Sequence, residues 1–192
     1  MKRWLAILMA ASLACLALPA AAEPQAEKPE AAPEHLSEAL PEPPMTYERL
    51  GRILLALDPE AQPLGAGFRL SIAGLPVLVL TDAAADRMRA MVPLRPAGDL
   101  SAKDLMRMMQ ANFDSALDAR YAVAKGHLWA VYIHPLSPLQ KDQLILGLGQ
   151  MVNIARTYGT LYSGGALQFR GGDSRGLQRQ LIDELLKKGE EI

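Results

Sequence analysis

Residues 120 to 158 read RYAVAKGHLWAVYIHPLSPLQKDQLILGLGQMVNIARTY, and this stretch decides the fold. Two runs rich in β-branched and aromatic residues, 121–124 and 128–134, flank Lys125, Gly126 and His127. Glycine takes the positive φ of a tight turn without steric cost, so the pattern predicts a β-hairpin. The second strand leads into a long amphipathic segment, which predicts a helix ending near residue 158.

The second strand of this hairpin is apolar on both faces. Side chains alternate along a strand, which places Leu128, Ala130 and Tyr132 on one face and Trp129, Val131 and Ile133 on the other. Such a strand usually has the protein's own helices on one face and another cover on the second. We therefore predict a partner-binding surface that includes Leu128 and Tyr132.

The segment after the strand predicts a core-facing helix. Pro135 and Pro138 end the strand, and Ser137 is placed to cap the first helical turn. One face carries Leu144, Leu148, Met151, Val152, Ala155 and Tyr158, and the opposite face carries Gln143, Gln150, Asn153 and Thr157. Leu146 lies among the polar residues and is a third candidate for partner binding. Gly147 and Gly149 predict close contact with a neighbouring backbone.

The N-terminus has the pattern of a secretory signal peptide over residues 1–22. Lys2 and Arg3 precede an uncharged apolar run, and small residues end at Ala22. Cleavage after Ala22 predicts a periplasmic or secreted protein, and retention of the segment as an anchor is the alternative. Cys15 lies inside the apolar run, so the cleaved chain contains no cysteine and forms no disulfide.

Residues 23–44 predict a flexible acidic linker, because six glutamates and six prolines leave almost no apolar surface to bury. Residues 45–192 are then long enough for a single domain. Of the 20 basic residues, three precede position 45, and of the 21 acidic residues, six do, which leaves 17 against 15. This balance does not favour a nucleic-acid-binding surface.

The remaining segments predict an α+β domain. Thr46 caps a helix, a hairpin turns at Ala73 and Gly74, and Ser101 caps a second helix. Residues 82–94 fit either a capped helix or a third strand, and the alternation of apolar residues with arginines, together with Pro93, favours the strand. A last amphipathic helix spans about 174–188. The predicted order is helix-β-β-β-helix-β-β-helix in a sandwich with an antiparallel sheet, followed by the extra C-terminal helix.

Catalytic and metal-binding patterns are weak. Residues 172–176 match G-x-S-x-G, but the histidine of that arrangement follows the serine, and no histidine lies beyond His134. A helix cap is the simpler interpretation. His127 and His134 point to opposite faces of one strand, about 23 Å apart at 3.3 Å per residue, and His35 lies in the linker. We predict no catalytic residue, metal site or cofactor.

The element order from Thr46, with the passages DLMRMMQANF and HLWAVYIHPLSPLQKDQL, resembles the Tir-chaperone or YbjN-like fold of type III secretion chaperones. The resemblance covers residues 45–158. It implies an α+β sandwich, frequently dimeric, that binds a partner polypeptide on exposed apolar surface and catalyses nothing. The signal peptide and the extra C-terminal helix depart from the chaperone pattern.

Together these features predict an exported, non-enzymatic protein-binding module. The expected partner is another protein or a second copy of the chain in a homodimer, with no nucleic acid and no integral membrane span after cleavage. An envelope hydrolase or small-ligand-binding domain is the alternative.

Overall fold

The computed structural model describes residues 42–114, 116–158 and 174–190, and it confirms the predicted α+β class. The helices are α1 (Tyr47–Leu57), the short 3-10 helix η1 (Ala97–Asp99), α2 (Ala102–Asp114), α3 (Lys141–Arg156) and α4 (Ser174–Gly189). The strands are β1 (Gln62–Pro63), β2 (Gly67–Ile72), β3 (Leu75–Asp82), β4 (Arg87–Pro96), β5 (Arg120–Ala124) and β6 (His127–Pro135).

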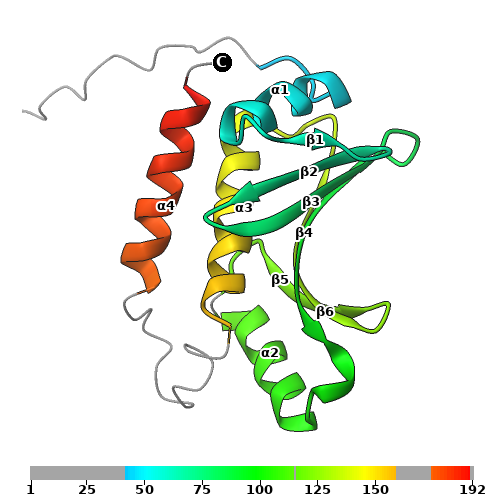
Figure 1. Cartoon of the computed structure of the whole chain (residues 1–192), viewed down its shortest axis with the longest axis vertical. Helices are drawn as coiled ribbons and strands as arrows, with labels where there is room; N and C mark the ends of the chain where they lie inside the picture. The colour runs from blue at the N-terminus through cyan, green and yellow to red at the C-terminus, as the bar shows by residue number, and fades with distance from the viewer. Residues whose placement is uncertain (1–41, 115, 159–173, 191–192) are drawn as a thin grey trace, which may run out of the picture. The chain divides into compact units, whose positions relative to one another are not determined.

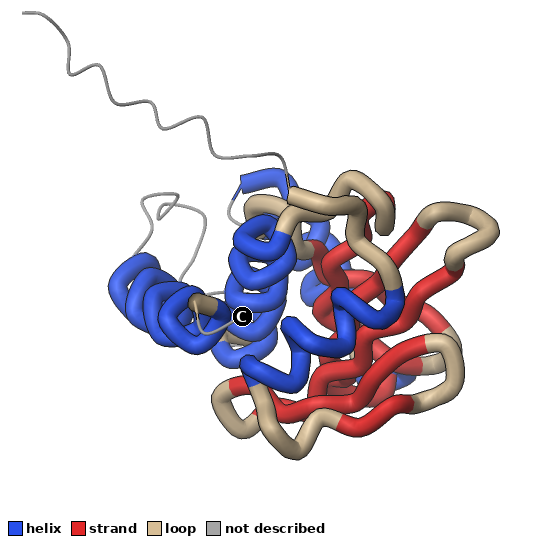
Figure 2. Tube along the Cα trace, turned by 90° about the horizontal axis from the view of Figure 1, so that it is seen from above, coloured by secondary structure: helices blue, strands red, loops and turns tan. Residues whose placement is uncertain are grey.

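The six strands form one antiparallel sheet in the order β1-β2-β3-β4-β6-β5. Helices α1 and α3 lie on one face of this sheet, which we call the inner face, and α4 packs on the far side of α3 (Figures 1 and 2). Helix α2 lies beside the edge strand β5. No helix of the described residues covers the opposite face, which we call the open face.

Local sequence signals place most of these elements. The side-chain oxygen of Thr46 accepts a hydrogen bond from the Arg49 N–H at 3.2 Å, which caps α1 as predicted. Lys125 and Gly126 have φ of 50° and 73°, the left-handed pair that a two-residue hairpin turn requires. Residues 87–96 form β4, with a bulge between Pro93 and Arg95, which settles the ambiguous segment as a strand.

The core lies between the inner face and α3. Phe68, Val79, Ala90 and Tyr132 are consecutive partners across β2, β3, β4 and β6, and all four are buried. They meet the apolar stripe of α3, including Leu144, Leu148 and Met151, which have no exposed surface. This row and this stripe hold the two layers together, since buried apolar area is the main stabilising contribution to a domain of this size.

Two residues on the polar side of α3, Gln150 and Asn153, are buried, contrary to the amphipathic pattern predicted for this helix. The carboxamide of Asn153 donates to the side chain of Gln178 on α4 at 3.3 Å. The Gln150 carboxamide oxygen accepts from the backbone N–H of Asp118 at 2.9 Å. Because α4 and the loop before β5 cover these side chains with hydrogen-bonding partners, α3 is a central helix and not a surface one.

The two glycines of α3 contact side chains, and the prediction of a neighbouring backbone is wrong. A Cβ atom on Gly147 would lie 2.3 Å from the Tyr132 ring, and one on Gly149 would lie 2.6 Å from Ile182 of α4. Each glycine therefore lets α3 approach the layer on one of its sides.

Ser137 does not cap α3, because it is engaged elsewhere. Its N–H and hydroxyl donate to the two carboxylate oxygens of Asp86 at 2.7 and 2.9 Å. The Ser137 backbone N–H and then its hydroxyl lower the pKa of Asp86. Helix α3 begins at Lys141, and the Gln143 side chain accepts from the Gln140 N–H at 3.1 Å to complete its first turn. The contact with Asp86 joins the β3–β4 turn to the segment between β6 and α3.

Candidate protein-binding surfaces

Leu128 and Tyr132 do not lie on an exposed surface, so the prediction that they bind a partner there is corrected. They are 0% and 4% exposed. Tyr132 belongs to the core on the inner face, and alternation along β6 places Leu128 on the same side of the strand. Tyr132 packs against Gly147, and its hydroxyl donates weakly to the Gln143 carbonyl at 3.4 Å. Burial raises the pKa of Tyr132 to about 12. The alternation along β6 was predicted correctly, but the open face is the one that carries Trp129, Val131 and Ile133.

Leu146 is partly exposed on α3, with 37% of its surface accessible. It is the one predicted contact residue of the three that lies at the surface. A single exposed leucine is ordinary in a folded domain, so Leu146 by itself marks no site.

Helix α2 turns its apolar side chains outward. Met108 is buried, whereas Met106, Met109 and Phe113 are 62%, 67% and 91% exposed. Positions 106, 109 and 113 share one helix face, since residues three and four apart are neighbours on a helix. With the exposed Leu105 and Leu117, they form what we call the α2 ridge. Several large apolar side chains exposed on and beside one helix face are typical of a protein-binding site.

Polar contacts of Asn112 and of the first turn fix the position of α2, which bears the ridge. Asn112 accepts from the Tyr121 N–H at 2.7 Å and donates to the Tyr121 carbonyl at 3.1 Å, which binds α2 to the β5 edge. At the N-terminus of α2, the Asp104 N–H donates to the Ser101 hydroxyl at 3.1 Å, which confirms Ser101 as the N-cap of this helix. Sequence analysis missed the ridge, although two adjacent apolar pairs, 105–106 and 108–109, are more than one helix face can bury.

The open face of the sheet combines apolar side chains with arginines. One row of partners across the strands is Arg69, Leu78, Met91, Val131 and Arg120, and the adjacent row contains Leu80, Arg89 and Ile133. Ile133 is 51% exposed, and Leu80 is exposed on the other side of Arg89. The first row is therefore apolar between two arginines, and the second places an arginine between two apolar residues.

A hollow of about 430 Å³ lies at one end of this face. Leu80 and Ile133 form apolar walls, and Arg87 and Arg89 contribute guanidinium groups. Asp82 also lines the hollow, and its carboxylate accepts from the Ala85 N–H at 3.0 Å in the turn. The hollow can accommodate an apolar side chain next to an anionic group.

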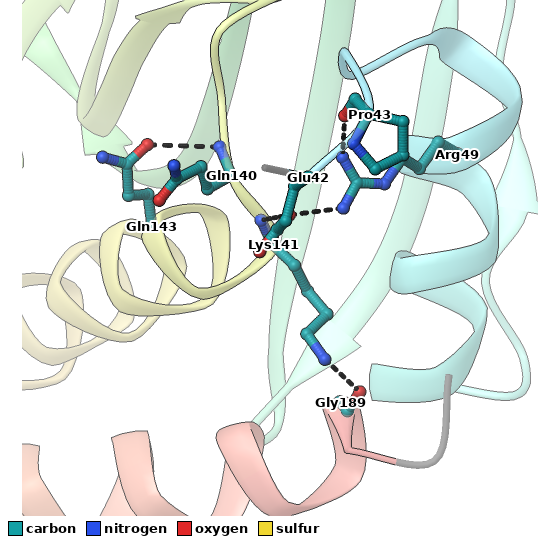
Figure 3. A network of polar contacts seen from close by, with 7 residues as sticks. All are labelled: Glu42, Pro43, Arg49, Gln140, Lys141, Gln143 and Gly189. Atoms are coloured by element: carbon teal, nitrogen blue, oxygen red, sulfur yellow. Dashed lines mark hydrogen bonds and ion pairs between the residues drawn. The ribbon is translucent and has the colours of Figure 1, made fainter. Parts of the chain in front are cut away.

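A polar network anchors the chain where the predicted linker meets the domain (Figure 3). Glu42 forms an ion pair with Arg49 and accepts from the Lys141 N–H at 2.9 Å, at the start of α3. The Lys141 N–H is the main cause of the lowered pKa of Glu42. The Lys141 ammonium donates to the Gly189 carbonyl of α4 at 3.1 Å. Residues 42–44, assigned to the linker by sequence, thus contact α1 and α3, and Lys141 extends the network to α4.

The described residues that were considered as metal ligands do not form a metal site. Within the described residues, no group of three His, Cys, Asp or Glu side chains could hold a metal ion. His127 and His134 each bond a nearby carbonyl, of Lys125 and Pro135 respectively. The G-x-S-x-G segment begins outside the described residues. His35 and the predicted signal peptide also lie outside them. No helix in the described part of the chain is both long enough and apolar enough to cross a membrane.

Comparisons with known proteins give similar structures but no family. No protein-family model matches the chain, and a comparison with curated proteins finds no match. One similar solved structure is a chain of the HopA1–SchA chaperone–effector complex, with 17% identity, a TM-score of 0.44, and coverage of 57% of this chain and 92% of that chain. Another comes from the complex of the Yersinia pestis type III secretion chaperone SycH with a stable fragment of YscM2. It has 18% identity, a TM-score of 0.44, and coverage of 58% of this chain and 98% of that chain.

Both complexes contain a chaperone, the kind of protein that the sequence resembles, and nothing in the comparisons supports a YbjN-like assignment. Similarity at this level assigns neither a family nor a partner to the chain.

Proposed function

We propose that this protein is an exported, non-enzymatic protein-binding module that forms a homodimer through the α2 ridge. The observation that carries the proposal is the exposure of Met106, Met109 and Phe113 on one face of a helix that Asn112 anchors to β5. Apolar side chains in this number are stabilised by burial, at about 1.5–3 kcal/mol for each large side chain fully removed from water.

A second copy of the chain is a suitable cover for the ridge. In a two-fold dimer the same patch occurs on both partners, so a patch must complement itself. The ridge meets this condition because it is apolar, and Met side chains adapt their shape to the facing surface. An isologous contact would bury Met109 and Phe113 of both protomers, together with the flanking Leu105 and Leu117.

Sedimentation velocity of the purified protein tests the homodimer. We expect the parent to sediment as a dimer and Met109→Ser/Phe113→Ser as a monomer, with its dissociation constant raised at least about 100-fold, or about 2.7 kcal/mol. Val123→Ser is a matched control, because Val123 is exposed but lies outside the ridge. A parent that is monomeric at all concentrations, or a dimer that the double substitution leaves intact, contradicts the proposal. Leu146→Ser, measured alongside, decides whether the exposed leucine of α3 belongs to the interface.

Export is proposed from the N-terminal sequence pattern of residues 1–22. Intact-mass spectrometry of protein recovered from the cell envelope is expected to give a chain that begins at Glu23. A mass that includes residues 1–22 would show that the segment is retained, which is the anchor alternative.

A further inference from the structure

The open face of the sheet has a charge pattern that specifies its partner more closely than the α2 ridge does. Among the strand positions that face this side, Arg69, Arg87, Arg89 and Arg120 contribute four cations, and Asp82 is the one carboxylate. The whole chain, in contrast, has a formal net charge of −1. Positive charge is therefore concentrated on an apolar face, and this combination favours a ligand that is both apolar and anionic.

Two arginines of this face, Arg69 and Arg89, have no internal anion. Within the described residues, their side chains form no hydrogen bond or ion pair, and the side chain of Arg120 donates to the Ala119 carbonyl at 2.6 Å. Arg87 donates to the Asp86 carbonyl at 3.3 Å. Guanidinium groups in fixed strand positions match carboxylates in a bidentate geometry.

The apolar part of the face fits side chains of a polypeptide. The exposed Leu80 and Ile133 flank Arg89 across the strands. In the next row, the partly exposed Leu78 and Met91 lie between Arg69 and the buried Val131. Nucleic acid would need aromatic side chains for stacking, and Trp129 is the one aromatic residue at the strand positions of this face. A second copy of the chain is also disfavoured, because a two-fold contact would bring arginines against arginines.

The edges of the sheet determine how such a polypeptide would lie. At the β5 edge the backbone N–H and C=O of Tyr121 are occupied by the Asn112 carboxamide. On the opposite side of the sheet, where β2 extends beyond the two-residue edge strand β1, the Ser71 N–H donates to the Asp58 carboxylate at 2.7 Å. Side chains thus replace the backbone partners that an added strand would supply, so a bound segment is directed across the face.

We propose that the open face binds an acidic amphipathic polypeptide segment of a partner protein. Its apolar side chains lie on Leu80, Met91 and Ile133, and its carboxylates contact Arg69 and Arg89. The hollow beside Arg87 and Arg89 receives one apolar side chain with an adjacent carboxylate. This inference rests on the proposed function as a protein-binding module, but it concerns a surface separate from the α2 ridge.

Selection from a phage-displayed library of random 15-residue peptides on the full chain tests the inference. We expect enriched peptides to combine Asp or Glu with Leu, Ile, Phe or Met. The most enriched peptide is then measured by fluorescence anisotropy. Arg69→Glu/Arg89→Glu should weaken its binding about tenfold or more and should shift the selection toward Lys and Arg. The matched control is Arg52→Glu, an exposed arginine of α1, which should leave both results unchanged.

Several outcomes would overturn the inference. These are selection without acidic enrichment, no enrichment at all, or a charge-reversed variant that keeps the parent's preference while circular dichroism shows an intact fold. Tighter binding of a 20-nucleotide single-stranded DNA or of anionic phosphatidylglycerol vesicles, lost in Arg69→Glu/Arg89→Glu, would assign the face to another class of ligand and also overturn it. Met109→Ser/Phe113→Ser should leave peptide affinity unchanged. Because this variant is expected to change sedimentation and not peptide affinity, the two measurements distinguish a wrong dimer proposal from a wrong proposal for the open face.

Discussion

Replacing Gly147 with alanine tests the packing of α3 on the sheet. The new Cβ would lie 2.3, 2.4 and 2.6 Å from three carbons of the Tyr132 ring. Carbon atoms in contact prefer about 3.5–4.0 Å, so ring and helix must separate by about 1 Å. Tyr132 is 4% exposed, and its ring is held between β6 and α3, so it has no open space to enter.

The expected loss follows from two opposing effects. Overpacking a core costs about 1–3 kcal/mol, and this site lies at the upper end because three ring atoms are too close. Alanine is favoured over glycine in a helix interior by about 1 kcal/mol, which offsets part of the loss. We therefore expect Gly147→Ala to destabilise the protein by about 2 kcal/mol and to lower Tm by about 4–8 °C for a chain of this length.

Urea unfolding followed by circular dichroism measures this change. Gly98→Ala is the matched control, because no atom lies within 4 Å of a Cβ at Gly98 and its φ is not positive. In a Tyr132→Leu background, Gly147→Ala should lose most of its destabilising effect, because the clashing ring is gone. The reasoning is refuted if Gly147→Ala is as stable as the parent, or if its effect is the same in both backgrounds.

Three further predictions concern polar contacts. Asn112→Ala removes two hydrogen bonds to the Tyr121 backbone, so we expect a loss of about 1–3 kcal/mol in urea unfolding and more light scattering from the opened edge. Gln110→Ala, on the exposed side of α2, should change neither. Glu42→Gln should lower Tm at pH 7. The pKa of Glu42 is lowered in the fold, so the ionised Glu42 carboxylate stabilises the folded protein above the ordinary pKa of 4.5. This stabilisation is lost as the pH falls through the lowered pKa. The Tm difference between parent and variant should therefore shrink between pH 7 and pH 3. Asp86→Ala, which removes a carboxylate of lowered pKa, should show the same sign of pH dependence, and a difference in Tm that grows in acid would contradict both expectations.

The parts of the fold that depend on neighbouring residues could be predicted from the sequence. The turn at Lys125 and Gly126, the caps Thr46 and Ser101, and the strand nature of 87–96 all follow from local conformational preferences. Ser137 failed as a cap because its competing partner, Asp86, is 51 positions away in the chain. A capping residue satisfies whichever backbone or side-chain group the tertiary fold brings to it, and local sequence does not show that group.

The candidate surfaces were harder to predict, because alternation divides a strand into two faces without saying which one a helix will cover. For β6 both faces are apolar, and the glycine at 147 beside Tyr132 is the one signal that pairs α3 with the inner face. The polar residues Gln150 and Asn153 were equally misleading, since amides are buried readily when another helix supplies partners. An amphipathic pattern therefore identified α3 as a core helix but missed the contact with α4.

The placement of α2 links the two surfaces. Helices α1 and α3 cover the inner face and α4 covers α3, so α2 is the one helix in the described residues that could shield the open face. Instead, Asn112 fixes α2 at the β5 edge, where it blocks strand addition but leaves its own ridge exposed. Moving α2 over the open face would break both Asn112 hydrogen bonds and free the edge. The arrangement therefore gives two separate apolar surfaces, the α2 ridge and an arginine-bearing face, in place of one large patch that would bind partners without selectivity.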